Sequence, residues 1–269
     1  VTITSPGMSQ ISFDAATAKA LERAYHKRDM LRRRRHVHDA LAPVAGERIL
    51  DIGCGPGFYV RELLDVVGPS GSIVGVDASP DMLGLARQRC EGHSNVTFRD
   101  GNATALPVDD GDFDAALCVQ VMEYVPDPPA ALAEIYRALR PGGRALIWDV
   151  DWGTVWWHTA DPDRMRRVLS AWDEHLVHPS LPRRLGAYFR AAGFVDVAVA
   201  GHSFATVDYD DESFAVLMLG MAADFVPGRG GVTGDEAAAW LTEQRDLAEQ
   251  GEFFFEGTQF CFTARKPAS

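Results

Sequence analysis

The sequence predicts an α/β fold in which an open, mostly parallel sheet carries helices on both faces. Three observations predict it. The chain has 269 residues, which suits one α/β domain. Short apolar runs alternate with helical segments as far as residue 150, and the first apolar run ends in a glycine-rich turn. Strands that alternate with helices are joined by right-handed crossovers and therefore lie parallel.

The elements of the first half follow in order. Residues 1–12 are rich in Ser, Thr, Pro and Gly and predict a loose arm, and residues 13–42 predict helices that end before Pro43. Strands are expected at 49–52, 73–76, 96–98, 113–119 and 145–150. Helices are expected between them at 58–67, 80–90, with Ser79 as N-cap, and 129–139, ending at Pro141-Gly142-Gly143.

The second half is richer in helix. Asp161 caps a helix expected at 162–177, with Pro162 in its first position. The pattern then predicts a helix at 181–192 and a strand at 194–199. Two helices within 208–250, around a loop at 227–234, are expected next, and an aromatic strand at 253–264 follows them. No repeat and no long linker divides these elements, so we expect a single domain over 1–269.

Composition excludes several classes of function. The chain is 46% hydrophobic and 24% charged, as globular enzymes are, and its net charge of −12 disfavours nucleic acid and anionic membranes. The four cysteines lack metal-ligand spacing, so no metal is expected. No apolar leader or membrane-spanning run is present, which predicts a cytoplasmic protein. A homodimer is left open as an alternative to a monomer.

The glycine-rich turn is the strongest motif. Ile49-Leu50-Asp51-Ile52 leads into Gly53-Cys54-Gly55-Pro56-Gly57, and the next strand ends at Asp77. Glycines let a ligand approach the backbone closely, and a carboxylate at that strand end can accept both ribose hydroxyls of an adenosine. The spacing is G-x-G-x-G, whereas dinucleotide binders favour G-x-G-x-x-G, which disfavours an oxidoreductase.

Residues 47–150 resemble the class I methyltransferases of the ubiquinone/menaquinone C-methyltransferase type. Five stretches carry the resemblance: Leu50-Asp51-Ile52-Gly53-Cys54-Gly55-Pro56-Gly57, Val74-Gly75-Val76-Asp77-Ala78-Ser79-Pro80-Asp81-Met82-Leu83, Gly101-Asn102-Ala103-Thr104-Ala105-Leu106-Pro107, Phe113-Asp114-Ala115 and Leu139-Arg140-Pro141-Gly142-Gly143-Arg144. The resemblance implies a Rossmann-like seven-stranded sheet whose last strand is antiparallel. It also implies that the cofactor is S-adenosyl-L-methionine and that the product is S-adenosyl-L-homocysteine.

The resemblance assigns roles around the cofactor. Asp51, Gly53 and Gly55 would hold its methionine end, with a carboxylate that only orders the loop as the alternative for Asp51. Asp77 would bind the ribose. The adenine would meet four residues: Ala78, Met82, Asn102 and Ala103. Relatives often carry Asp where Asn102 stands, but an amide carbonyl also accepts from the adenine amino group.

The floor and the lid of the cofactor site follow from the same resemblance. Gln120 would line the floor near the sulfonium. Relatives use an N-terminal helix as a lid, in which Tyr25 or Arg33 would meet the cofactor carboxylate. Lid helices are thus expected at 13–42, and the segments 151–180 and 208–250, outside the cofactor-binding core at 47–150, are expected as insertions that cap the substrate.

The segment after residue 150 should bind the methyl acceptor. Five of the six tryptophans lie between 148 and 172, where aromatic walls suit a flat or apolar molecule. Trp152, Trp156 and Trp157 are substrate-binding candidates, with packing onto the sheet as the alternative, whereas Trp148 and Trp172 are expected in the core. A hydroxyl or enol acceptor also needs a proton acceptor. The candidates are His158, His175, Glu123 and Asp151.

These observations predict methyl transfer from S-adenosylmethionine to an O, N or C atom of a small, aromatic or apolar metabolite. The Asn/Asp-Pro-Pro-aromatic box of nucleic-acid amino-methyltransferases is absent after the fourth strand, where residues 118–124 stand. Arsenite methylation would need cysteines in the substrate segment, and only Cys261 follows Cys118. A non-methylating cyclase or a binding module on the same fold is the remaining alternative.

Overall fold

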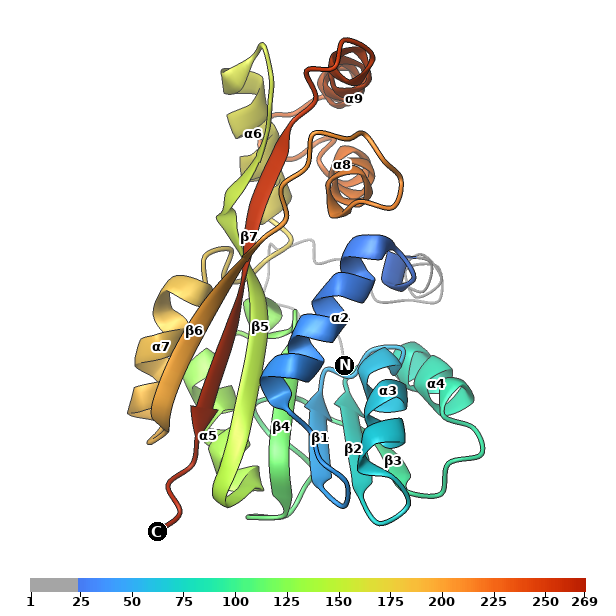
Figure 1. The fold of residues 1–269 in the computed structure, drawn as a ribbon. Helices are drawn as coiled ribbons and strands as arrows, with labels where there is room; N and C mark the ends of the chain where they lie inside the picture. Colours follow the sequence, from blue (N-terminus) through green and yellow to red (C-terminus); the bar gives the residue numbers. More distant parts are fainter. Residues whose placement is uncertain (1–23) are drawn as a thin grey trace.

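A seven-stranded sheet forms the centre of the computed structural model, which describes residues 24–269 (Figure 1). The strand order is β3-β2-β1-β4-β5-β7-β6, with the first five strands parallel and β7 antiparallel to both its neighbours. The predicted mostly parallel sheet with an antiparallel last strand is therefore confirmed. The loose arm predicted at 1–12, and the helical segment before residue 24, lie outside the described residues.

The parallel half of the sheet follows the predicted alternation closely. The strands are β1 (Arg48–Ile52), β2 (Ser72–Asp77), β3 (Val96–Asp100) and β4 (Phe113–Val119), and the helices between them are α3 (Phe58–Val67), α4 (Pro80–Arg89) and α5 (Pro128–Ala138). Strands β1 and β4 are buried along nearly their whole length, as central parallel strands covered on both faces are. Ser79 caps α4 as predicted, since its hydroxyl accepts the Met82 amide at 3.3 Å.

Strand β5 (Leu139–Trp157) is much longer than the predicted strand at 145–150. Leu139 already pairs with Phe113 of β4, so helix α5 ends at Ala138, before the Pro-Gly-Gly turn. At its far end β5 continues through Trp157 because it stays paired with β7 (Phe255–Arg265). The two strands leave the sheet as a ribbon that reaches the helices drawn above it in Figure 1.

Three helices surround the far end of this ribbon: α6 (Pro162–Asp173), α8 (Phe214–Phe225) and α9 (Gly234–Glu249). We call them, with the ribbon end, the cap. Hydroxyl and carboxylate N-caps start all three, at Asp161, Ser213 and Thr233. Helix α6 corresponds to the helix predicted at 162–177, and the predicted end at 177 is wrong. It stops at Asp173 because the amides of residues 177 and 178 bond to the Glu123 carbonyl, which pulls the chain back to the sheet.

The remaining elements complete the two faces of the sheet. Helix α7 (Pro182–Ala191) and edge strand β6 (Val195–Ser203) lie close to the predicted ranges. Helices α5 and α7 cover one face, and α3, α4 and α2 (Arg28–Leu41) cover the other (Figure 1). Within residues 24–269, no helix is both long and apolar enough to cross a lipid bilayer.

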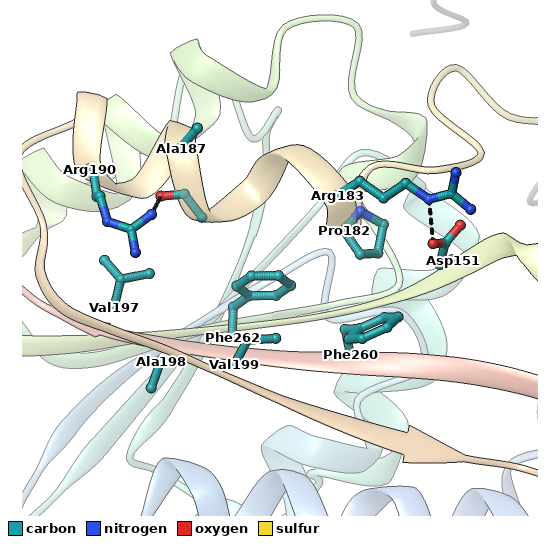
Figure 2. A pocket seen from close by; sticks show the side chains of 11 residues that line it. Asp151, Pro182, Arg183, Ala187, Arg190, Val197, Ala198, Val199, Phe260 and Phe262 are labelled. Atoms are coloured by element: carbon teal, nitrogen blue, oxygen red, sulfur yellow. Dashed lines mark hydrogen bonds and ion pairs between the residues drawn. The ribbon is translucent and has the colours of Figure 1, made fainter.

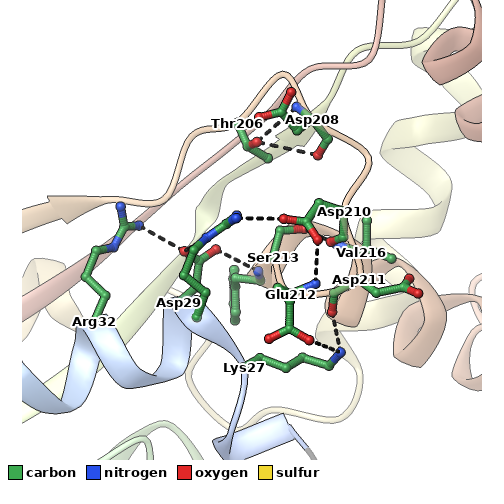
Figure 3. A network of polar contacts seen from close by, with 12 residues as sticks. Lys27, Asp29, Arg32, Thr206, Asp208, Asp210, Asp211, Glu212, Ser213 and Val216 are labelled. Atoms are coloured by element: carbon green, nitrogen blue, oxygen red, sulfur yellow. Dashed lines mark hydrogen bonds and ion pairs between the residues drawn. The ribbon is translucent and has the colours of Figure 1, made fainter.

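Helix α2 is tied to the cap as well as to the sheet (Figure 3). The buried carboxylate of Asp29 accepts the Phe214 amide at the start of α8 at 2.8 Å. Beside it, Arg28 pairs with Asp210 at 2.7 Å, and Lys27 lies 3.9 Å from Glu212. These contacts join the first turn of α2 to the loop that begins α8, and we call them the α2–α8 latch.

Candidate functional site

The glycine turn lies at the carboxyl end of β1, against the end of β2. Gly53 and Cys54 donate their amides to the Val76 carbonyl at 2.7 and 3.0 Å. Gly53 has a φ of +67°, and a Cβ there would come within 2.2 Å of Val121. Gly55 has a φ of +52°, but a Cβ there would meet nothing within 4 Å. The turn is therefore closed against the protein at Gly53 and open toward a ligand at Gly55.

Asp77 organises this turn from the end of β2. Its Oδ2 accepts the Gly55 amide and its Oδ1 accepts the Ser79 amide, both at 2.8 Å. Burial raises the pKa of Asp77 above its usual range, although these amide bonds act in the opposite direction. Each carboxylate oxygen has a further lone pair. Asp77 can therefore hold the loop and still accept hydroxyl groups from a ribose.

Asp51 lies on β1 just before the turn, and its carboxylate is 2% exposed. Its Oδ2 has no hydrogen-bond partner among the described residues. Burial, and then the charge of Asp77, raises its pKa to about 8. A buried acceptor without a donor is costly unless a ligand supplies one. An ammonium group at Asp51 would supply both a donor and a positive charge.

Two buried donors face the same region without acceptors. The Nε of Arg33, on α2, and the hydroxyl of Tyr59, on α3, have no partner of ordinary hydrogen-bond geometry among the described residues. Burial raises the pKa of Tyr59, and the charge of Arg33 and a hydrogen-bond contact with it oppose this rise, so the two side chains lie close together. Unpaired donors beside an unpaired acceptor match the carboxylate and ammonium ends of an amino acid. Tyr59 was missed by the sequence analysis; its position directly after the glycine turn was the available signal.

Helix α2 reaches the floor of the site. Arg33, fully buried, donates to the side-chain carbonyl of Gln120. Gln120 follows β4 with a φ of +53°, and its amide bonds to the Trp148 carbonyl at 2.7 Å. Tyr25 stacks on Phe58 with ring centres 4.8 Å apart. The charges of Arg33 and Asp51 both act on the Tyr25 hydroxyl, so the residues predicted for the methionine end converge in space.

The residues predicted to meet the adenine lie at the ends of β2 and β3. Ala78 is exposed next to Asp77, whereas Met82 and Ala103 are buried. The Asn102 Oδ1 already accepts two bonds from Thr104, from its amide at 3.0 Å and its hydroxyl at 3.1 Å. That oxygen therefore orders its own turn in this structure, and the contact of Asn102 with the adenine stays a prediction.

A second polar group lies beyond the end of β4. Glu123, in the short 3₁₀ turn Met122–Tyr124, is buried and accepts the Trp152 Nε1 at 2.7 Å. Burial raises its pKa to about 7, against the opposing effects of Trp152 and Arg33. Trp152 in turn contacts His175, with ring centres 5.7 Å apart. The structure thus brings together Glu123, Trp152 and His175.

His175 is buried and neutral. Its ring contacts Trp172 at 4.0 Å between centres, and its Nδ1 interacts with the Trp172 carbonyl. Burial lowers its pKa to about 4. Trp172 is buried on α6 and Trp148 on β5, as expected for core residues.

The ribbon carries the other three predicted residues away from this region. Trp157 packs on Trp240 and Phe255 in the cap, with ring centres 5.5 and 4.7 Å away. Trp156 is half-buried and the His158 side chain is exposed. The His158 amide bonds to the Phe254 carbonyl at 2.8 Å. Because β5 continues beyond residue 151, these side chains lie at the cap rather than beside Glu123.

Asp151 faces a different part of the molecule (Figure 2). Its carboxylate binds Arg183 of α7 at 2.7 Å and borders a hollow of about 550 Å³. The hollow lies between α7 and strands β6 and β7, with Arg183 and Arg190 at its polar ends over Phe260 and Phe262. This feature is separate from the glycine turn, and the turn residues do not line it.

Asp149, in the middle of β5, is a fully buried carboxyl group that was not predicted. Its oxygens have no partner of ordinary hydrogen-bond geometry among the described residues, and burial raises its pKa well above the usual value, although the nearby Val121 amide opposes this rise. The available signal was a charged residue inside the otherwise apolar run at 145–150. In residues 24–269, no cluster of three or more His, Cys, Asp or Glu side chains is placed to hold a metal ion.

The strand order, the glycine turn and the carboxylate at the end of β2 together define the fold of a class I methyltransferase. A protein-family model described as a methyltransferase domain matches residues 50–147. A demethylmenaquinone methyltransferase of Symbiobacterium thermophilum is 34% identical over 176 residues, which cover 56% of this chain and 69% of that protein. The chain therefore belongs to the S-adenosylmethionine-dependent methyltransferases.

Solved structures agree on the fold. Phosphoethanolamine N-methyltransferase 2 of Haemonchus contortus, in complex with S-adenosyl-L-methionine, is 19% identical with a TM-score of 0.63, covering 96% of this chain and 61% of that chain. The [4+2]-cyclase SpnF is 25% identical with a TM-score of 0.56, covering 88% of this chain and 82% of that chain. The chain spans about a third to a half of the length of the first curated relatives that it matches.

Proposed function

We propose that this protein transfers a methyl group from S-adenosylmethionine to an O, N or C atom of a small, aromatic or apolar metabolite. The observation that carries the proposal is the set of unpaired buried atoms beside the glycine turn. Asp51 lacks a donor there, while Arg33 and Tyr59 lack acceptors. An amino-acid group satisfies both needs at once, and the methionine end of this cofactor is such a group.

The residues that would hold the cofactor follow from this arrangement. Asp51 receives the ammonium, and Arg33 and Tyr59 receive the carboxylate. Asp77 accepts from the ribose while it holds the Gly55 amide. Ala78, Met82 and Ala103 surround the adenine, and Gln120, fixed by Arg33, lies below the sulfonium. When bound, the cofactor supplies a methyl group on a positively charged sulfur.

The chain's own contribution is alignment, water exclusion and proton removal. Among the predicted proton acceptors, Glu123 fits best, because a buried carboxylate with a pKa of about 7 can take a proton near neutral pH. Its partner Trp152 adds an aromatic wall on the acceptor side. His175 packs against that wall, and its pKa of about 4 makes it a weaker base.

The acceptor is proposed to be small because helix α2 and the cap cover this region. The α2–α8 latch holds the two covers together, which suits an enclosed site rather than an open cleft for a protein or nucleic acid. The curated relative named above acts on demethylmenaquinone by its name, and the solved relative on phosphoethanolamine. This range of acceptors among relatives leaves the acceptor of this chain to experiment.

The alternative is a non-methylating cyclase on the same fold, which the similarity to the cyclase SpnF favours. Calorimetry with S-adenosylmethionine, S-adenosylhomocysteine and NAD tests the cofactor assignment: both sulfur ligands should bind and NAD should not. A panel of phenols, quinols, amines and polyketides with methyl-labelled cofactor then tests transfer. Binding without S-adenosylhomocysteine formation across the panel would favour the cyclase, and absence of binding would overturn both.

A further inference from the structure

The hollow between α7 and strands β6 and β7 has the size of a ligand site but no role in the proposed methyl transfer (Figure 2). Its volume of about 550 Å³ falls within the range of small-molecule pockets, about 300–1,000 Å³. Asp151 and Arg183 form one end through their ion pair, and Arg190 stands at the other end. The hollow can therefore be considered as a site in its own right.

Small residues on one side of α7 leave the hollow open. Gly186 and Ala187 line it between the two arginines, which lie two turns of helix apart, or about 10 Å. A Cβ at Gly186 would lie 3.9 Å from the Phe262 ring and 3.4 Å from the Arg190 guanidinium. A longer side chain at Gly186 would thus enter the space between the helix and the strands. The absence of a side chain there keeps that space free.

The floor of the hollow is apolar and aromatic. Phe260 and Phe262 are two residues apart on β7, so both rings stand on the side of the sheet that faces α7 (Figure 2). Their partners on the edge strand β6 are Gly201 and Val199. Val199 is 57% exposed, so apolar surface is left uncovered at this edge. Covering such surface with an apolar ligand would be favourable.

The charge at the two ends of the hollow is unequal. Arg183 is paired with Asp151 at 2.7 Å. The Arg190 guanidinium donates to the Gly186 carbonyl of its own helix at 3.0 Å, and no carboxylate of residues 24–269 pairs with it. Asp151 is the only acid among the described residues that line the hollow. In a chain of net charge −12, this end of the hollow is therefore a local excess of positive charge that attracts an anion.

We propose that the hollow binds a small amphipathic carboxylate, with the carboxylate at Arg190 and the apolar body over Phe262 and Phe260. A guanidinium has five N–H donors in a fork that matches a carboxylate, and the Gly186 carbonyl uses only one nitrogen. The length of about 10 Å between the two arginines suits a short alkyl chain. The site takes part in no step of methyl transfer, so its test does not depend on the proposed function.

Three ligands with the same alkyl chain test the charge and the apolar requirement together. Ligand-detected NMR measures the binding of octanoate, octanol and octylamine, and we expect octanoate to bind most tightly and octylamine least. Arg190→Gln should weaken octanoate binding by about threefold to fivefold, as loss of a partly exposed ion pair does, and should leave octanol binding unchanged. Arg184→Gln is the matched control, because the Arg184 guanidinium lies over the Tyr188 ring and does not line the hollow.

Two further variants change the hollow itself. Gly186→Leu should abolish the binding of both octanoate and octanol by filling the space, and α7 should remain folded because leucine favours helix more than glycine does. Asp151→Asn removes the partner of Arg183, so octanoate should bind more tightly to this variant than to the wild type. Thermal unfolding of each variant checks that the fold is retained.

A photoreactive octanoate with a diazirine in its chain needs no variant. It should label residues within 182–190, 197–199 or 260–262 of the wild-type protein. Labelling confined to other segments, or equal octanoate binding by Arg190→Gln and Arg184→Gln, would overturn the inference and leave the proposed function untouched. Self-association of the wild type in the ultracentrifuge that Gly186→Leu abolishes would also overturn it, because the hollow would then be an interface between two copies of the chain.

Discussion

Gly53 and Gly55 occupy the same turn and the same region of φ, yet their surroundings differ completely. A side chain at Gly53 meets Val121 inside the protein, whereas one at Gly55 meets open space. Sequence alone identifies both as turn glycines. Only the structure separates a glycine that is closely packed from one that has open space beside it.

Substitution should separate these two roles. Gly53→Ala should destabilise the fold by several kcal/mol, because positive φ costs about 1–3 kcal/mol and the clash adds to it. Gly55→Ala should cost only the backbone strain but should strongly reduce S-adenosylhomocysteine affinity. Urea unfolding and calorimetry measure the two effects. The double variant Gly53→Ala with Val121→Ala should recover part of the lost stability; no recovery would contradict the packing explanation.

Asp77 holds the glycine turn and is also the residue proposed to bind the ribose. Asp77→Ala should weaken S-adenosylhomocysteine binding by about 1.5–3 kcal/mol, the range for hydrogen bonds to a charged group. Asp77→Asn keeps one acceptor oxygen and should lose less. Ser79→Ala, which removes only the cap of α4, is the matched control. Unchanged affinity in Asp77→Ala would show that the ribose lies elsewhere.

At the scale of elements, the α2–α8 latch joins helix α2, the proposed lid of the cofactor site, to the cap. Its central bond is buried, since Asp29 is 8% exposed, whereas the flanking pair of Arg28 and Asp210 is largely exposed. Buried caps contribute more to stability than exposed ion pairs do. The two parts of the latch should therefore respond differently to substitution.

Asp29→Ala should destabilise the protein by about 0.5–2 kcal/mol, as loss of a capping side chain does, and should raise amide hydrogen exchange in both α2 and α8. Asp210→Asn should cost less than about 1 kcal/mol, with an effect that disappears in high salt. If amide hydrogen exchange rose in α2 but not in α8, the two helices would not be coupled through the α2–α8 latch.

At the scale of the whole molecule, buried titratable groups act on the pH dependence of stability in opposite directions, as His175 and Glu123 illustrate. The pKa of His175 is lowered to about 4, so the unfolded chain binds more protons below pH 6.5 and stability falls as the solution becomes acidic. The pKa of Glu123 is raised to about 7, so the folded chain binds more protons between about pH 4 and 7, and stability falls as pH rises.

Removing either group should reveal the other. In His175→Phe the free energy of unfolding should fall more steeply with rising pH between 4 and 6.5, by up to on the order of 3 kcal/mol across that window. In Glu123→Gln it should instead rise more with pH than in the wild type. Urea unfolding at a series of pH values measures both. Parallel curves for all three proteins would mean that neither group titrates differently on folding.

The sequence was sufficient for the parts of the molecule that local chemistry specifies. The alternation of apolar strands and capped helices gave β1 to β4 and their helices within a residue or two, because each ends at a glycine, a proline or a capping side chain. It did not give the length of β5, because residues 151–157 are kept extended by pairing with β7, which lies about a hundred residues further on.

The same limit applies to the site. The motif residues Asp51, Gly55 and Asp77 lie at the adjacent ends of β1 and β2 and could be placed by their order alone. Tyr59 and Asp149 belong to a helix and a strand that look ordinary in sequence, and only the packed structure shows that both polar side chains are buried. His158 was predicted from its neighbours Trp156 and Trp157, and the extension of β5 places all three at the cap.

The length of β5 also determines how a molecule can enter. A single strand runs from Asp149 to Trp157 in the middle of the cap, and its pairing with β7 leaves only one irregular stretch between residues 151 and 156. This continuous pairing fastens the cap to the sheet. Helix α2 is joined to the cap at its first turn by one buried bond and a few exposed ion pairs, so we expect the cofactor to enter beneath this helix rather than through the cap.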